Sequence, residues 1–70
     1  MLILSIILFK THYSKESAIL WLTSHSKLYE IEENNESYIA IQIEPTLFDK
    51  YSFRLKEINA GLDFIIGQLK

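Results

Sequence analysis

His25 is the side chain of this chain best suited to acid–base or metal chemistry, because it stands between two hydroxyls, Ser24 and Ser26. A histidine that activates a serine also needs an acidic group to orient it, and neighbours in sequence seldom form such a triad. The second histidine, His12, and the carboxylates do not stand at metal-ligand spacing with it on one helical face. The chain has no cysteine. We therefore expect no catalytic residue, no metal and no cofactor, and interpret His25 as capping or packing a helix end.

Four glutamates bracket a predicted hairpin and form the densest group of like charges in the chain. Side chains alternate between the faces of a strand, so Glu30 and Glu32 are expected on one face and Glu33 on the other. Catalytic carboxylates must converge in a cleft where their pKa values are pushed apart. Because these side chains diverge, we interpret them, together with Glu36, as a solvated surface.

Arg54 and Lys56 share one face of a predicted strand, and we expect Tyr38 and Gln42 of a neighbouring strand beside them. Basic and aromatic side chains on an open sheet are typical of proteins that bind single-stranded nucleic acid. Cross-strand ion pairs are the favoured interpretation, since glutamates expected on the same face would repel phosphate. A nucleic-acid contact at these four residues is kept as an alternative.

The composition predicts one folded domain over residues 1–70. The chain is 49% hydrophobic, with only two glycines and one proline, which is not typical of disorder. Its net charge of −2 gives no general attraction to nucleic acid or to an anionic membrane. A chain this short buries only about 60% of its extended surface. Its many apolar residues therefore need very tight packing or a partner.

The opening segment, Met1–Phe9, predicts a buried strand. It lacks the basic region and the cleavage site of a secretory signal. As a helix it would rise only about 13 Å, against a bilayer core of about 30 Å, so we expect no membrane partner. A strand with two apolar faces needs cover on both sides. One face carries Leu2, Leu4, Ile6 and Leu8, and the other carries Ile3, Ile7 and Phe9.

Ser14 predicts the start of a helix that runs to about His25, because its hydroxyl can accept the free N–H groups of the first turn. Glu16 complements the positive end of the helix dipole. Trp21, the only tryptophan, is interpreted first as an anchor between helix and sheet and second as a contact for a partner.

Two strands, Lys27–Glu33 and Ser37–Glu44, follow the helix and are joined by a tight turn at Asn34-Asn35 with positive φ angles. Pro45–Lys50 predicts a single helical turn, and Tyr51–Ile58 a further strand. The residues expected to point inward are Tyr29, Ile31, Ile39, Ile41, Ile43, Tyr51, Phe53 and Leu55.

The last segment, Leu62–Lys70, follows a predicted turn at Asn59-Ala60-Gly61 and is either a helix or a strand. A helix fits its apolar residues slightly better, although Gly67 weakens that assignment. The whole order predicts an α+β fold with two layers, a mostly antiparallel sheet and one main helix on one face.

One helix covers only one face of such a sheet, so part of the apolar surface is left for a partner. We expect a protein partner or a second copy of the chain there. The contact residues predicted for it are Leu2, Leu4, Ile6, Leu8, Leu28 and Trp21.

The helix also carries the pattern Ala18-x-x-Trp21-Leu22-x-x-His25. It resembles a small uncharacterised domain of bacteriophages and large DNA viruses, where such a helix precedes an acidic turn, an aromatic strand and a proline. A glycine after the histidine and an arginine before the glutamine of that domain are missing here. The other matching residues are Glu32-Glu33, Tyr38, Gln42, Pro45, Gly61 and Ile66-Gly67.

This resemblance implies a viral origin, a place in the virion or the host cytoplasm, and no assigned activity. We therefore expect a non-enzymatic interaction or structural domain within a larger assembly, such as a virion or its head. Two alternatives are a nucleic-acid-binding module and a small viral inhibitor that masks a host protein.

Overall fold

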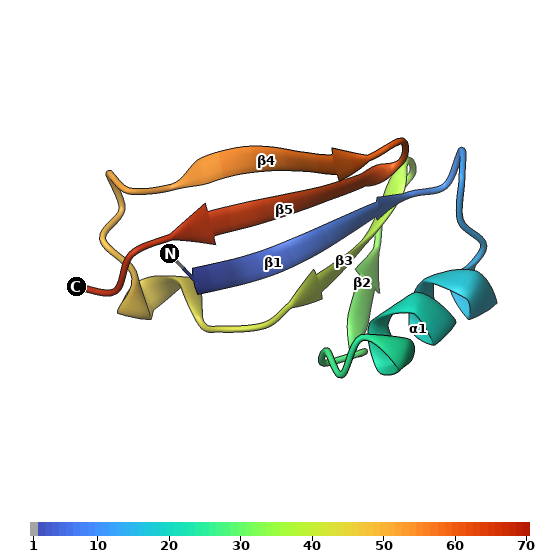
Figure 1. The fold of residues 1–70 in the computed structure, drawn as a ribbon, viewed down its shortest axis with the longest axis horizontal. Coiled ribbons are helices and arrows are strands. Elements are labelled where there is room, and N and C mark those ends of the chain that lie inside the picture. The colour runs from blue at the N-terminus through green and yellow to red at the C-terminus, as the bar shows by residue number, and fades with distance from the viewer. Residues whose placement is uncertain (1) are drawn as a thin grey trace.

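A computed structural model describes residues 2–70, which form one five-stranded antiparallel sheet and one α-helix (Figure 1). The spatial order of the strands is β2-β3-β1-β5-β4, so the first strand is the central one. The predicted α+β fold with one main helix is confirmed, and Met1 lies outside the described residues. The elements are β1 (Leu2–Phe9), α1 (Lys15–Ser24), β2 (Ile31–Glu33), β3 (Ser37–Ile41), the 3₁₀ turn η1 (Pro45–Leu47), β4 (Arg54–Asn59) and β5 (Leu62–Gly67).

The central strand β1 pairs with β3 on one side and with β5 on the other. Ile6 stands opposite Ala40 of β3 and opposite Phe64 of β5. Directly opposed residues share a face, so these three side chains point to the same side of the sheet. The last segment, for which the sequence left helix and strand open, contains the strand β5. This strand is hydrogen-bonded to the side of β1 that β3 does not occupy.

The helix α1 begins where the sequence predicts. Ser14 Oγ accepts the Ser17 N–H at 3.2 Å, and Ser17 Oγ accepts the Ser14 N–H at 2.8 Å. This reciprocal cap satisfies backbone donors that have no partner within the helix. The helix ends at Ser24, and Ser26 then adopts a positive φ of 57° that turns the chain back toward the sheet.

One face of the sheet and one stripe of α1 form the core. Figure 1 shows α1 on the β2–β3 side of the sheet and β4 at the opposite edge. No residue of β4 belongs to the core cluster of the described chain. The buried residues of this cluster are Ile6, Leu8, Ala18, Leu22, Tyr38, Ala40 and Leu62, with Ile3, Tyr13, Trp21, Ile31 and Phe64 packed against it.

The prediction of which β3 residues point toward the core is wrong. Tyr38 and Ala40 are buried, whereas Ile39 is only half-buried and Ile41 is exposed. The reason is the register with β1, which places Ala40 opposite Ile6 on the face that α1 covers. Ala40 of this face and Ala18 of α1 are both fully buried in the same core cluster.

Further details differ from the sequence-based expectation. Tyr29, Tyr51 and Leu55 were expected to point inward and are exposed, and Leu55 lies on the edge strand β4. The hairpin turn does not use positive φ angles at its asparagines within the described chain. Instead, Asn34 Oδ1 accepts the backbone N–H groups of Glu36 and Ser37, each at 2.8 Å.

We expect Leu22→Ala to reduce the free energy of unfolding by about 2–5 kcal/mol, because it leaves a cavity at a side chain that is 0% exposed. Leu20→Ala is the matched control on the same helix. Its side chain is 67% exposed, so the change should stay within about 0.5 kcal/mol. Urea unfolding followed by circular dichroism measures both, and equal effects would contradict this packing of α1.

Candidate functional site

The sheet face that α1 leaves uncovered carries a band of apolar side chains. Ile7 of β1 stands opposite Ile39 of β3, and Leu55 of β4 stands opposite Ile65 of β5. These residues alternate along their strands with those of the core face, so they point away from α1. We call this surface the outer face, and define its apolar band by Ile7, Ile39, Ile41, Leu55 and Ile65.

The band is accessible in the isolated chain. Leu55 is 60% exposed, Ile41 is 40% exposed, and the other three residues are half-buried. At its centre Ser5 stands opposite both Ile41 and Ile65 and is only 5% exposed. The outer face is therefore an apolar sheet surface whose isoleucines and Leu55 provide the accessible area.

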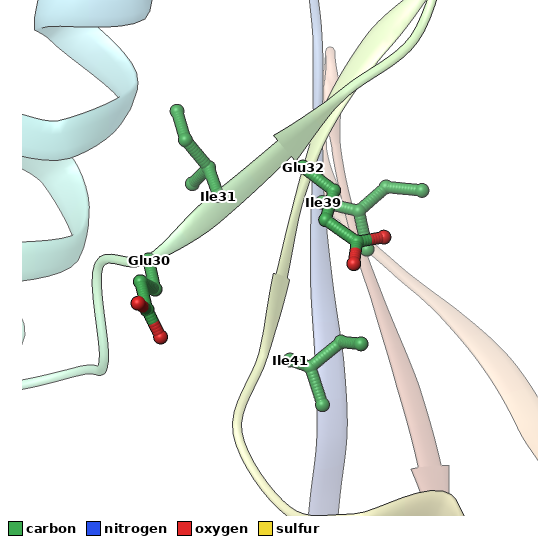
Figure 2. Close-up of a pocket in the computed structure, with 5 residues that line it drawn as sticks. All are labelled: Glu30, Ile31, Glu32, Ile39 and Ile41. Carbon is green, nitrogen blue, oxygen red and sulfur yellow. The ribbon is translucent and has the colours of Figure 1, made fainter.

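Figure 2 shows how this face meets the β2 edge. Ile39, Ile41 and the carboxylate of Glu32 lie on one side of the strands, and Ile31 points the other way, toward α1. These residues and Glu30 line a depression of about 360 Å³. The predicted separation of Glu32 from Glu33 is confirmed, since Glu33 stands opposite the core residue Tyr38.

The segment around η1 covers one end of the outer face. Phe48 is 1% exposed and packs on Phe53 with ring centroids 5.9 Å apart. A Cβ at Gly67 would lie 2.7 Å from the Phe48 ring, so only glycine fits beneath it. By alternation along β5, Gly67 faces the same side as Ile65. Cover is therefore local to this end, and the middle of the outer face stays open.

Three of the predicted partner contacts are corrected by the structure. Ile6 and Leu8 are each 0% exposed in the core, and Leu4 is 7% exposed at a bulge of β1. β1 does have two apolar faces, but the bulge between Ile3 and Ser5 changes their membership: Ile3 packs against the core, and Leu2 stands opposite Gly67 on the outer face. The helix α1 covers the face of Ile6 and leaves that of Ile7 open. Leu2 and Leu28 are exposed, and their contact with a partner stays a prediction.

Trp21 lies at the margin of the core, between α1 and β5. Its ring meets Phe64 edge-on at 6.3 Å and stacks on the His25 ring at 4.0 Å. The Trp21 carbonyl accepts a hydrogen bond from His25 Nδ1 at 2.8 Å. His25 thus closes the end of the helix, in agreement with its interpretation as a capping and packing residue.

The four residues of the predicted nucleic-acid contact are not brought together. Tyr38 is 8% exposed in the core, and Gln42 donates to and accepts from the Leu28 backbone at 2.9 Å. Arg54 and Lys56 lie on β4, and two strands, β1 and β5, separate β4 from β3. The expectation that they neighbour Tyr38 and Gln42 is therefore wrong.

Other ligand sites are not formed by the described residues. Within residues 2–70, no three histidine, aspartate or glutamate side chains gather closely enough to hold a metal ion. In the same range, no helix has the length and apolar character needed to span a membrane.

No protein-family model, curated protein or solved structure matches this chain. The function of the chain is therefore inferred from its own surface. Its strongest feature is the outer face, an apolar area that the described chain covers only at one end.

The ion pair of the described residues lies on the opposite side of the sheet. Lys10 Nζ donates to Glu33 Oε2 at 2.6 Å. This hydrogen bond and the charge of Lys10 hold the pKa of Glu33 below its ordinary value of 4.5.

We expect Lys10→Gln to raise the pKa of Glu33 toward 4.5, and Lys10→Arg to keep it lowered. The pKa of Glu33 is lower in the folded chain than in the unfolded chain. The ion pair therefore stabilises the fold at pH values above the unfolded-state pKa of Glu33. This stabilisation is lost as the pH falls through the folded-state pKa. The carboxyl carbon shift of Glu33, followed in an NMR pH titration, measures the effect. An unchanged titration curve in Lys10→Gln would contradict the pair.

Proposed function

We propose that this chain is a non-enzymatic interaction domain that works within a larger viral assembly and docks there through its outer face. The observation that carries the proposal is the apolar band on a face that α1 does not reach. Apolar side chains gain free energy when they leave water, and a contiguous exposed group of them is typical of a contact surface.

The size of the chain supports this proposal. A domain of 70 residues has one small core, so surplus apolar residues on a second sheet face are a liability unless something covers them. The Ala18-x-x-Trp21-Leu22-x-x-His25 pattern and its resemblance to domains of bacteriophages and large DNA viruses support the viral part. A place in the virion or in the host cytoplasm follows from that resemblance alone.

We expect Leu55→Glu to weaken partner capture or self-association roughly tenfold or more, because it places a charge in the apolar contact. Leu20→Glu is the control, since Leu20 is comparably exposed but lies on α1. Affinity capture from virus-producing cells and sedimentation at micromolar concentration measure the two kinds of contact.

Two outcomes would overturn the proposal. One is a stable monomer that captures nothing in either variant or in the unaltered chain. The other is loss of binding in Leu20→Glu with full binding in Leu55→Glu, which would place the contact on the helix.

A further inference from the structure

We infer that the occupant of the outer face is a basic amphipathic helix of a different protein, with an apolar stripe flanked by lysine or arginine, and not a second copy of this chain. The inference rests on the proposed function and names the chemistry of its partner. The charges that border the apolar band select this partner.

Every charged side chain that the strands place on the outer face is acidic. Glu32 stands opposite Ile39 at the β2 edge, and Glu57 stands opposite Asp63 near the β4 edge. The basic residues within the described strands, Arg54 and Lys56, stand opposite Ile66 and Phe64 and so point to the other face. The band therefore has carboxylates on both sides and no base among them.

Glu57 and Asp63 stand directly opposite each other on β4 and β5. Like charges placed directly opposite each other across two strands destabilise a sheet. Neither residue is in an ion pair within residues 2–70. A lysine or arginine supplied by a partner would remove this repulsion, and the apolar band would supply most of the binding free energy.

The dimensions of the face suit one helix. Neighbouring strands are about 4.8 Å apart, so the edges β2 and β4 are separated by four spacings, about 19 Å. A helix with its side chains is about 10–12 Å wide. A helix laid over β1 therefore reaches the carboxylates on both sides with its flanking lysines, whose stems can lie along the apolar surface.

A second copy fits this surface poorly. Face-to-face packing of two outer faces brings two acidic borders together, which like-charge repulsion opposes. Two-fold antiparallel pairing of the β4 edges is also disfavoured. Opposed residues must share a face, so the two registers centred on the middle of β4 set Lys56 or Glu57 opposite itself.

Three synthetic helical peptides test the inference with the full chain. The first has a leucine stripe flanked by lysines, the second has the same stripe flanked by glutamates, and the third keeps the lysines but has serines in the stripe. Fluorescence anisotropy gives their affinities, and amide shifts in NMR spectra locate the site.

We expect the leucine–lysine peptide to bind at least about tenfold more tightly than the other two, which is about 1.4 kcal/mol, and to shift the amides of Ile7, Ile39 and Ile65. Added salt should narrow its advantage over the glutamate peptide. Glu57→Lys should reduce several-fold the ratio of the affinity for the leucine–lysine peptide to that for the glutamate peptide. Glu36→Lys, the same change of charge in the hairpin loop, should leave it unchanged.

The outcomes separate the two claims. Equal binding of the lysine and glutamate peptides overturns the charge argument and leaves the outer face as a docking surface. A dimer that Leu55→Glu dissociates overturns the inference in favour of a second copy, while the proposed function stands. If no peptide binds, the inference fails, and the capture experiment with Leu55→Glu alone decides the proposed function.

Discussion

The structure depends on the contact between α1 and the core face of β1. Ile6 and Leu8 of the central strand meet Ala18 and Leu22 of the helix, and all four are fully buried. Through this contact the helix fixes which face of β1 is buried. Because residues paired across strands share a face, the register of β1 with β3 and β5 then determines which of their residues are buried as well. The open outer face is its direct consequence, since the same helix cannot cover both sides.

The helix also sets how much of the sheet is protected. Ten residues of α-helix are only about 15 Å long and 10–12 Å wide, whereas five strands span about 19 Å. The edge strand β4 therefore lies beyond its cover, and each of its residues is exposed. Its charges differ between the faces, with Arg54 and Lys56 on one and Glu57 on the other. This division gives the outer face its acidic border.

Local signals in the sequence predicted the kind of most elements, whereas the last segment was left open between helix and strand. The Ser14 cap, the alternating strands, the turn at Pro45 and the single helix on an antiparallel sheet are all present. The conclusion that His25 packs and caps also holds, because the helix register determines its neighbour Trp21. Such features depend on residues a few positions apart, and their geometry is nearly the same in any fold.

The face of each strand depends instead on register between distant segments. Periodicity separates Tyr38 and Ala40 from Ile39 and Ile41, but it does not say which pair the helix will cover, and the more apolar pair is the open one. Likewise, no local signal places two strands, β1 and β5, between β3 and β4. The sequence by itself determined the surplus of apolar surface and the kind of each element except the last, which it left open between helix and strand. Only the tertiary structure decided that this surplus lies on the Ile7 side between acidic borders, because one short helix buries one face of β1.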